Sequence, residues 1–518
     1  MRTPCDEAIL WSGGSEARCR ENAKPWVLIA TILGSSMAFI DSTVVNVALP
    51  AIQADFHATV VDVQWVVESY GLFLGALILV GGALGDLFGR RRIFLSGVAI
   101  FSVASAGCGI ASNIDLLILA RSIQGVGAAL LVPGSLAIIS SSFDEKSRGQ
   151  AIGTWSGFTA ITTAIGPVLG GWLVQHASWR WAFFINLPLA AAVIGTSFWA
   201  IPANRRMAAG RIDWIAALLA TIGLGGLVTG FLESVNLGWR NPYVFGSLIV
   251  GFGSLIAFVF VEARVTSPMV PLTLFRSRSF SGANLLTLLL YAAIGIFFFL
   301  FPLDLIQVQE YSPTEAGTAI LPMILVMFLL SRWAGGLVGR FGAKGPLIIG
   351  PVIAAIGFGL FAFLSVGESY WRSFFPALVI LGLGMTVTVA PLTTLVMNST
   401  EQERVGTASG INNAVARVAG VLAVAVLGIV MVKAFGFDLN RNLARLSLPP
   451  HILQELQANE IKLAGLQAPV GVDPAVSRAI TESVKKAFIY GFQKIMWICC
   501  ALSLTSAAIA WLMIPRRQ

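Results

Sequence analysis

The chain has 518 residues, of which 56% are hydrophobic and 12% are charged. Soluble domains carry about 25% charged residues because their surfaces face water, so this composition excludes a soluble protein and predicts a surface that faces lipid. The net charge of +8 would suit a nucleic-acid partner, but the basic residues are spread over many short loops, and this distribution excludes nucleic acid.

Residues 1–25 are predicted to form a cytoplasmic tail, because they mix basic and acidic residues and lack the apolar stretch of roughly 7–15 residues found in a secretory signal. Fourteen apolar segments follow, each close to the length of about 20 residues that a helix needs to cross a bilayer. The sequence therefore predicts an all-α membrane protein with fourteen transmembrane helices. The predicted spans are 26–50, 64–85, 93–112, 114–139, 149–174, 181–201, 213–233, 243–262, 280–303, 314–338, 345–366, 373–397, 404–432 and 487–514.

Lys and Arg residues in the loops set the predicted orientation, because cytoplasmic loops retain an excess of positive charge. With the N-terminus placed inside, the predicted inner segments carry twenty Lys and Arg residues, and the short outer loops carry three. Both termini are therefore predicted to be cytoplasmic, and the protein is expected to be a multi-pass protein of a bacterial-type inner (plasma) membrane.

The predicted spans fall into three groups. Residues 26–201 are expected to form an N-terminal six-helix bundle, residues 202–279 a linker with two additional transmembrane helices, and residues 280–514 a C-terminal six-helix bundle. The last group includes a periplasmic loop at 433–486. Within this loop, HILQELQANEIKLAGL (451–466) has helical spacing and predicts an amphipathic surface helix; a structured, non-catalytic cap is the expected role of the loop.

Two charged residues are predicted to lie inside the membrane at similar depths. Asp41, in FIDSTVVNVALP (39–50), lies about 13 Å below the outer end of the first span, and Arg121, in LILARSIQGVGAA (117–129), lies about 10 Å below the outer end of the fourth. Desolvation favours the neutral form of a buried carboxyl, and a nearby arginine favours its charged form. A carboxyl subject to both effects can bind and release a proton. The alternative is a fixed structural ion pair.

A glycine-rich basic motif, GALGDLFGRRR (82–92), follows the second span, and its small residues allow a tight turn at the inner interface. The segment 336–344 after the tenth span repeats the pattern, with Gly342 in the place of the last motif glycine, and such repeats are typical of transporters. The alternative is a stop signal made of positive charge alone. The residues that carry the motif are Gly82, Asp86, Gly89, Arg90 and Arg91.

The fifth span contains AIGPVLGGW (164–172). A proline inside a helix interrupts the backbone hydrogen-bond ladder, and paired glycines let another helix approach closely. Ordinary glycine packing is the alternative. The residues of this motif are Gly166, Pro167, Gly170 and Gly171.

Five further polar residues are candidates for a substrate site or a second proton site. Glu68, Glu233 and Asp304 are predicted near the outer ends of their spans, where a solvated mouth is the alternative for each. Arg417 follows Asn412 deep in the thirteenth span and is predicted to line a central cavity, because a lone charge facing lipid is costly.

Together these segments resemble the major facilitator superfamily, specifically its fourteen-span branch of drug:proton antiporters. GALGDLFGRRR is similar to the superfamily's loop 2–3 motif, RSIQGVGAA to its span-four arginine motif, and IGPVLGG to its span-five antiporter motif. FIDSTVVNVALP is similar to a span-one motif of this branch. WRWAFFINLP (179–188) and LFRSRSF (274–280) also resemble segments found in this branch. Thr162 stands where the span-five pattern has a glycine.

The resemblance implies two six-helix bundles that alternate access to a central cavity, with two inserted helices. It implies that Asp86 with Arg90 forms a cytoplasmic gate. It also implies that Arg121 takes part in proton coupling with Asp41, and that the span-five motif forms a pliable surface between the bundles.

The predicted function is a proton-coupled antiporter that exports small lipophilic drugs or toxic compounds, with cationic ones among the candidates. No GxxxxGK[ST] sequence supports ATP as the driving force, so no cofactor is predicted and the proton gradient is the expected energy source. No metal site and no Ser-His-Asp constellation is predicted, and an enzyme is not expected. The phenylalanines of FFFLF (297–301) are predicted to form an apolar cavity wall, with lipid contact as the simpler alternative.

Two other functions remain open from the sequence. The same fold could export one endogenous metabolite or antibiotic, or the protein could be a non-transporting membrane receptor or scaffold. The expected partners are a small-molecule substrate, protons and the lipid bilayer, and the protein is expected to act as a monomer or with an accessory periplasmic adaptor. Replacing Asp41 with Asn is expected to abolish coupled export while leaving folding intact.

Overall fold

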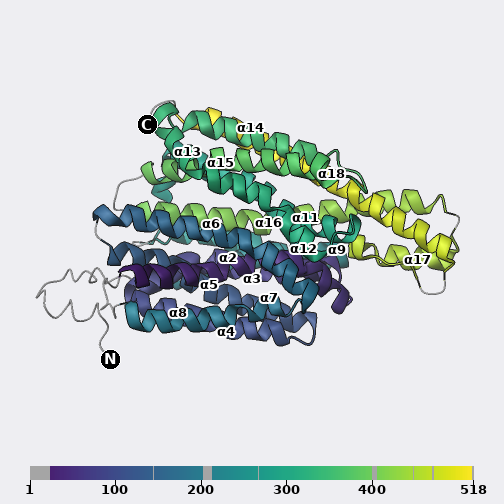
Figure 1. Cartoon of the computed structure of the whole chain (residues 1–518), viewed down its shortest axis with the longest axis horizontal. Coiled ribbons are helices and arrows are strands. Elements are labelled where there is room, and N and C mark those ends of the chain that lie inside the picture. Colours follow the sequence, from purple (N-terminus) through teal and green to yellow (C-terminus); the bar gives the residue numbers. More distant parts are fainter. Residues whose placement is uncertain are drawn as a thin grey trace, which may run out of the picture.

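The structure, a computed structural model, describes residues 24–143, 145–201, 213–265, 268–399, 405–446, 448–469 and 472–515. This part of the chain is built of helices and contains no strand. Long helices run side by side along a common direction (Figure 1), as expected in lipid, where each backbone polar group needs a partner within the protein. The predicted all-α membrane fold is confirmed.

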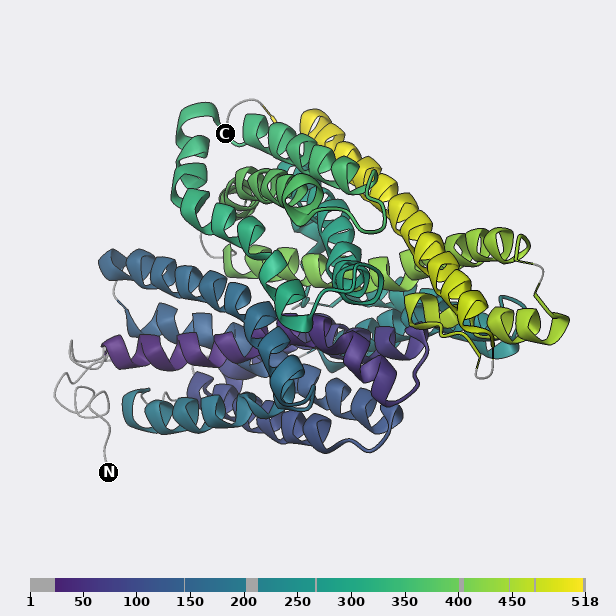
Figure 2. The ribbon, with the colours of Figure 1, turned by 45° about the vertical axis from the view of Figure 1, so that its right-hand side comes forward.

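Helices α2 to α8 pack on one another as the first bundle. Figure 2 shows it, in purple to blue, beside the second bundle, in green to yellow. The closest helix pairs are α3 with α5, α4 with α5, and α2 with α6. The helices are α2 (Lys24–Asp55), α3 (Val60–Phe88), α4 (Arg90–Ile110), α5 (Ile114–Ser142), α6 (Glu145–His176), the short α7 (Trp181–Phe184) and α8 (Asn186–Ala200).

The second bundle is formed by α11 to α18, in which α14 packs on α15 and α18, and α11 packs on α16 and α18. A π-helical turn continues α11 at one end of the bundle. The elements are α11 (Arg278–Leu303), η3 (Asp304–Val308), α12 (Pro313–Ala319), α13 (Leu321–Phe341), α14 (Lys344–Phe361), η4 (Tyr370–Phe374), α15 (Phe375–Asn398), α16 (Val405–Leu443), α17 (Pro450–Ala458), η6 (Glu460–Gly465) and α18 (Pro474–Met513), and the 3-10 turn η2 (Leu272–Arg276) precedes α11.

The helix pair α9 (Trp214–Leu237) and α10 (Pro242–Glu262) lies outside the two bundles. Helix α9 packs against α3 of the first bundle and α16 of the second. Helix α10 packs chiefly on α9 and exposes large apolar side chains such as Ile256, which is 70% exposed. An apolar surface of this kind fits contact with lipid. Helix α9 therefore lies over the contact between α3 and α16, and α10 lies on the lipid side of α9.

Thirteen of the described helical segments are long and apolar enough to cross a membrane. The predicted fifth span lies in α6, a further helix of 32 residues. Each predicted span thus falls on a helix, and the chain is a multi-pass membrane protein.

Helix α2 begins and α18 ends at the same end of the bundles, which we call the inner end (Figure 1). By the orientation predicted from Lys and Arg, this end is cytoplasmic. Helix α17 lies beyond the opposite, outer end. The segment between α16 and α18, residues 444–473, is called the outer cap.

The outer cap is shorter than the loop predicted at 433–486, because α16 continues to Leu443 and α18 begins at Pro474. The predicted amphipathic helix also ends early. Helix α17 stops at Ala458, and the 3-10 turn η6 that follows is kinked at Leu463, whose φ is 50°. The apolar spacing that suggested one long helix instead places Leu456 and Leu463 in the main hydrophobic core, which residues of both bundles share.

Three of the four phenylalanines at 297–301 are buried in the protein interior, and the fourth, Phe298, is half-buried. Phe297, Phe299 and Phe301 are at most 1% exposed, and the Phe361 ring centroid lies 5.0 Å from that of Phe297 and 5.6 Å from that of Phe301. For these three residues both sequence interpretations are wrong: their aromatic rings lie in the core of the second bundle, where ring–ring contacts add to apolar packing.

The repeated basic motif occupies equivalent turns in the two halves. Gly89 ends α3 with φ 101°, and Gly342 ends α13 with φ 69°. These backbone conformations are accessible almost only to glycine. The aligned glycines therefore mark the same structural feature, a turn at the inner end that leads directly into the next helix.

Replacing Gly89 or Gly342 with Ala is expected to lower the free energy of unfolding by about 1–3 kcal/mol, since each new side chain would be forced into a strained conformation. Gly345→Ala in α14 is the matched control, because a Cβ there meets open space and its φ is not positive. Thermal unfolding of the purified variants in detergent measures the effect. Equal melting temperatures for all three variants would contradict it.

Candidate functional site

A buried ion pair joins α2 and α5 in the interior of the first bundle. Arg121 Nη1 lies 2.5 Å from Asp41 Oδ2, and the two side chains are 1% and 0% exposed, respectively. The structure therefore brings together the two charged residues whose depths, counted along the sequence, are nearly equal, and it places both away from lipid.

Two amide side chains complete the surroundings of the Asp41 carboxylate. Gln124 Nε2 donates to Asp41 Oδ1 at 2.7 Å, and Asn186 Nδ2 donates to the same oxygen at 3.2 Å. The hydroxyl of Ser105 accepts hydrogen bonds from both amides. Helices α2, α4, α5 and α8 thus converge on one carboxylate, which fixes its position.

Arg121 is held by contacts beyond Asp41. Its Nε donates to the Val66 carbonyl oxygen of α3 at 3.0 Å, and Nη1 also donates to Gln124 Oε1 at 2.7 Å. The guanidinium carbon lies 4.3 Å from the centroid of the Tyr70 ring, a distance at which a cation is attracted by the ring face. The arginine therefore links α5 to α2 and to α3.

This arrangement fits an ionised Asp41. Both carboxylate oxygens accept from donors, Oδ2 from Arg121 and Oδ1 from Gln124 and Asn186. A buried charge is tolerated when it is paired and fully hydrogen-bonded. The pair has almost no exposed surface, so a proton can reach Asp41 only after the surrounding helices move.

Tyr70 lies near two arginines, one from each bundle. Its ring covers Arg121 in the first bundle, and it is also within electrostatic range of Arg417 on α16 of the second bundle. Arg417 itself is half-buried, and a Cβ added to Gly75 of α3 would lie 3.6 Å from its Cβ. The ion pair is thereby connected to the seam between α3 and α16.

Asn412 lies one and a half turns before Arg417 on α16. Its Nδ2 donates to Thr287 Oγ1 at 2.7 Å and to Asn284 Oδ1 at 3.2 Å. Its described polar contacts are therefore with α11 of the same bundle, and Asn412 positions α16 against α11.

Glu68 is buried at the seam between the bundles. Gln64, one turn earlier on α3, donates to the Val424 carbonyl oxygen of α16 at 3.3 Å, and a Cβ on Gly71 would lie 2.9 Å from Val421 of α16. Glu68 shares this face of α3, is 1% exposed, and its Oε2 has no hydrogen-bond partner in the described part of the chain. The alternative of a solvated mouth does not describe this carboxyl.

Glu233 ties α9 to the first bundle. Its Oε1 accepts from Trp65 Nε1 of α3 at 3.1 Å, and its Oε2 accepts from Asn236 Nδ2 at 3.3 Å. The carboxylate is half-buried and engaged with neighbouring side chains, so in this conformation it anchors the inserted helix pair.

The basic motif at the inner end is joined to neighbouring helices of its own bundle. Arg90 Nη1 donates to the Ala137 carbonyl oxygen at 2.9 Å, and Arg91 Nη2 donates to the Phe198 carbonyl oxygen at 3.0 Å. Asp86 belongs to α3, but its side chain lies outside the described residues, and Gly82 makes only ordinary contact with Pro133. The two hydrogen bonds thus secure the start of α4 to α5 and α8.

The glycines of the span-five motif bring α6 against both bundles. A Cβ on Gly166 would lie 3.1 Å from Thr43 Cβ, and one on Gly170 would lie 3.0 Å from Val44 Cγ1, both on α2. On the other side, a Cβ on Gly171 would lie 2.7 Å from the Pro313 carbonyl carbon of α12. Helix α6 is therefore packed between α2 and α12 through its smallest residues.

The contact between α6 and α12 is reciprocal. A Cβ on Gly317 of α12 would lie 2.7 Å from the Pro167 carbonyl carbon of α6. The two backbones approach closely because glycine from each helix faces backbone of the other. This approach joins the two bundles near the outer end.

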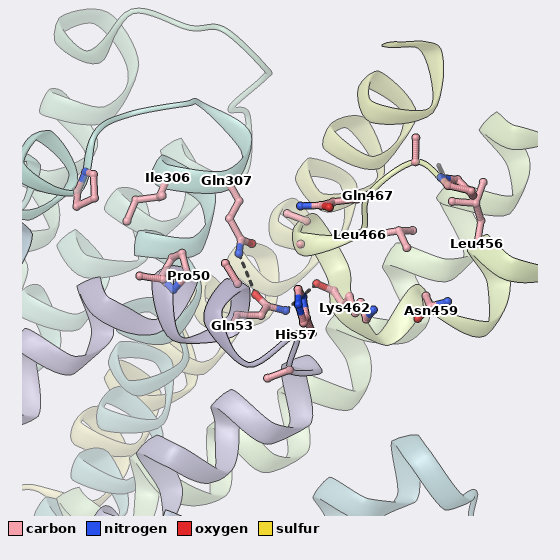
Figure 3. A pocket seen from close by; sticks show the side chains of 18 of the residues that line it. Pro50, Gln53, His57, Ile306, Gln307, Leu456, Asn459, Lys462, Leu466 and Gln467 are labelled. Atoms are coloured by element: carbon pink, nitrogen blue, oxygen red, sulfur yellow. Dashed lines mark hydrogen bonds between the residues drawn. The ribbon is translucent and has the colours of Figure 1, made fainter. Parts of the chain in front are cut away.

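A polar network joins the bundles at the outer end (Figure 3). Gln307 Nε2 of η3 donates to Gln53 Oε1 of α2 at 2.9 Å, and Gln53 Nε2 donates to the Lys462 carbonyl oxygen of η6 at 3.1 Å. These residues line a cavity of about 590 Å³ between the bundles and the outer cap. The outer end is closed in this conformation, and we call the three hydrogen-bonded residues the outer latch.

Asp304 opens the same π-helical turn that carries Gln307. It is 0% exposed, and neither of its carboxylate oxygens has a hydrogen-bond partner in the described part of the chain. It therefore differs from Asp41, whose two oxygens are both bonded.

Sequence reasoning missed the amides that hold Asp41 and the residues of the outer latch. Gln124 lies three residues after Arg121, a spacing that puts two side chains on the same helix face, and this signal could have found it. Gln53 and Gln307 are 254 residues apart and carry no pattern of charge or period that would have paired them.

The sequence matches the family model of the Major Facilitator Superfamily over residues 31–216 and 196–424. It is 34% identical over 499 residues to the tetracenomycin C resistance and export protein of Streptomyces glaucescens, covering 94% of this chain and 91% of that protein. It is 36% identical over 438 residues to the multidrug resistance protein Stp of Mycobacterium tuberculosis, covering 83% and 80% of the two chains.

The fold is also found among solved structures. A bacterial homologue of the human lysosomal transporter Spinster, in an inward-facing and unoccupied conformation, superposes with a TM-score of 0.64 and 19% identity, covering 96% of this chain and 99% of that one. At this identity the likeness concerns the fold alone. Fold, motifs and family model agree, and the chain belongs to the Major Facilitator Superfamily.

Proposed function

We propose that the protein is a proton-coupled antiporter that exports small lipophilic drugs or toxic compounds, cationic ones among them, by alternating access. The observation that carries the proposal is the Asp41–Arg121 pair, a satisfied but sealed carboxylate in the interior of the first bundle. The names of the relatives, a resistance and export protein and a multidrug resistance protein, support the class of substrate and the direction of transport.

In this proposal the present conformation is the stage at which Asp41 has lost its proton. When the outer end opens, a proton arriving from outside neutralises Asp41 and removes its attraction for Arg121. After the bundles swing, the proton leaves towards the cytoplasm and the pair seen here forms again. Re-formation of the pair then accompanies binding of the next substrate.

Arg121 is the proposed route by which the proton acts on the second bundle. The Arg121 guanidinium packs against the ring of Tyr70, which also lies near Arg417 of α16. Loss of the Asp41 charge changes what holds Arg121 in place, and Tyr70 is the side chain through which this change reaches the seam. Glu68, Asn412 and Arg417 are the proposed candidates for substrate contacts along that seam.

The remaining motif residues receive structural roles in the cycle. Asp86 with Arg90 is proposed to form a cytoplasmic gate at the inner end. The glycine faces of α6 and α12 are proposed to act as the surface on which the bundles rock, because a close backbone contact can separate without breaking side-chain hydrogen bonds.

The proposal includes no enzymatic activity and no cofactor, and the proton gradient supplies the energy. One chain is proposed to form the complete transport path as a monomer, with an accessory periplasmic adaptor as the alternative. Transport by single chains isolated in lipid vesicles would support the monomer, and a requirement for a second protein would support the adaptor.

The proposal is tested by dye efflux from cells that produce the protein. Energised cells are expected to accumulate less of a lipophilic cationic dye than cells without the protein, and an uncoupler is expected to abolish the difference. Efflux that survives the uncoupler and stops when ATP is depleted would contradict proton coupling.

The second candidate is a dedicated exporter of one compound. It is favoured by the resemblance over 94% of this chain to a protein named for resistance to, and export of, tetracenomycin C. Competition separates the two candidates. Inhibition of dye efflux by several chemically unrelated compounds supports a multidrug exporter, whereas inhibition by one chemical class alone supports the dedicated one.

A further inference from the structure

Asp304 lies at the outer end of the second bundle, in the π-helical turn η3. The turn follows Pro302 of α11, and its wider winding is seen in the hydrogen bond from the Gln309 backbone nitrogen to the Asp304 carbonyl oxygen at 3.0 Å. Single π-turns inside helices occur frequently at functional sites. This turn places an acidic side chain in the protein interior, 0% exposed, with no donor to either carboxylate oxygen among the described residues.

The elements packed against η3 are α11, α12, α18 and η6, and none of their described charged side chains bonds to Asp304. Lys485 of α18 pairs with Glu310. Glu315 of α12 accepts hydrogen bonds from Ser312. On η6, the Lys462 side chain lines the outer cavity, and Glu460 is half-buried beside Gly436. The described part of α11 near the turn is apolar.

The uncharged polar groups nearest to Asp304 do not satisfy it either. Gln309 and Tyr311 lie close enough to interact with its carboxyl. The Gln309 amide, however, donates to the Ser365 carbonyl oxygen at 3.1 Å and accepts from the Gly367 backbone nitrogen at 2.9 Å. The amide oxygen and one amide N–H therefore hold the loop after α14, and the second N–H makes no hydrogen bond to the Asp304 carboxylate in this conformation.

An ionised carboxylate without donors is costly to bury, and such a group is stable in an apolar site in its neutral form. The closed outer end is therefore compatible with a protonated Asp304. This is the opposite of Asp41, which is surrounded by three donors in the same conformation.

The turn that buries Asp304 also makes the outer latch. Gln307 follows Asp304 by three residues and bonds to Gln53 of α2, which in turn bonds to η6 of the outer cap (Figure 3). Ile306 and Gln307 line the outer cavity. Opening of the latch would move η3 away from α2 and let water from the outer side approach the turn.

We propose that Asp304 is a proton-binding site of the outer gate, which takes up a proton from the outer side as the latch closes and returns it to that side as the latch opens. The inference rests on the alternating access of the proposed function. Because closing takes up a proton, a lower outer pH favours the closed state. Because the proton returns to the side it came from, Asp304 adds nothing to the ratio of protons to substrate.

The test measures how far the outer end is open at a series of pH values. Spin labels are placed at the exposed positions Ala54 of the first bundle and Val366 of the second, with the five native cysteines replaced, and the purified protein is held in lipid nanodiscs. Asp304→Asn is expected to match the unsubstituted protein at low pH and to be more closed at high pH, because Asn remains neutral. The closed-to-open ratios of the two proteins are expected to diverge by up to about tenfold per pH unit, the limit for one proton.

Two further variants make the result specific. Glu310→Gln removes an exposed carboxylate from the neighbouring turn and is expected to follow the unsubstituted protein at every pH. Gln307→Ala weakens the latch without removing a titrating group, and is expected to open the outer end by a similar factor at every pH. Superposition of the Asp304→Asn curve on that of the unsubstituted protein, or a Gln307→Ala variant that stays closed, would overturn the inference.

Flux measurements separate this inference from the proposed function. Asp304→Asn is expected to leave the ratio of protons to substrate unchanged, and a lower ratio would identify Asp304 as a carrier and overturn its role as a gate site. If export by the unsubstituted protein did not depend on the pH gradient, the proposed function would be contradicted. The spin-label measurement of outer-end opening against pH would remain a separate test of Asp304 as a gate site.

Discussion

Asp41→Asn is expected to abolish export driven by a pH gradient and, at the same time, to lower the free energy of unfolding by about 3–5 kcal/mol, the usual effect of removing one partner from a buried ion pair. Coupling is lost because Asn cannot titrate. Stability is lost because Arg121, 1% exposed, keeps its charge without a counter-ion. The sequence alone suggested that folding would stay intact, and complete burial of the pair corrects that expectation.

A double variant separates the two effects. Asp41→Asn combined with Arg121→Gln leaves no unpaired charge, so most of the lost stability is expected to return while coupled export remains absent. Thermal unfolding in detergent measures the first effect, and substrate uptake into inverted vesicles under an imposed pH gradient measures the second. Gradient-driven uptake by the double variant would mean that the pair is only structural.

Gly171→Ala and Gly317→Ala are expected to cause the next largest loss of export. At each position a methyl group would lie 2.7 Å from a backbone carbonyl carbon of the opposite bundle, Pro313 for the first and Pro167 for the second. Backbone cannot move aside as a flexible side chain can, so α6 and α12 would have to separate. The closed outer end would be destabilised, and export is expected to fall at least tenfold, the change produced by about 1.4 kcal/mol.

Gly253→Ala in α10 is the matched control for these two variants. It also adds a methyl group to a membrane helix, but nothing lies within 4 Å of the added atom. Export assays on vesicles with equal amounts of each protein measure the effect. If Gly171→Ala and Gly253→Ala exported equally well, the close approach of α6 and α12 would not matter for transport.

The position of the central ion pair could be predicted because it depends on helix geometry alone. Counting residues from Pro50 and from the start of the fourth span places Asp41 and Arg121 at similar depths, and neither charge is stable against lipid. The amides around Asp41 could not be placed in the same way. A neutral amide is tolerated at many depths, so Asn186 carries no signal of burial before the bundle is known.

The outer end was predicted less well, because contacts between distant segments decide its structure. Glu68 was predicted near the outer end of its span, with a solvated mouth as the alternative, yet α16 covers that face of α3. The apolar positions around Leu456 and Leu463 fit a helix in the sequence, but α17 ends at Ala458 and the backbone is kinked at Leu463, where η6 packs against helices of both bundles. The bridging position of α9 likewise depends on two partners, α3 and α16, that its own sequence does not identify.

The central claim is that protons and substrate move in opposite directions through Asp41, and substrate-driven proton flux tests it most directly. Purified protein is reconstituted into vesicles with a pH-sensitive dye inside and no initial pH gradient, and a substrate gradient is then imposed. The account predicts proton movement against the direction of substrate flow in the unsubstituted protein and none in the Asp41→Asn, Arg121→Gln double variant. Substrate flux without proton movement, or equal proton movement in both proteins, would contradict it.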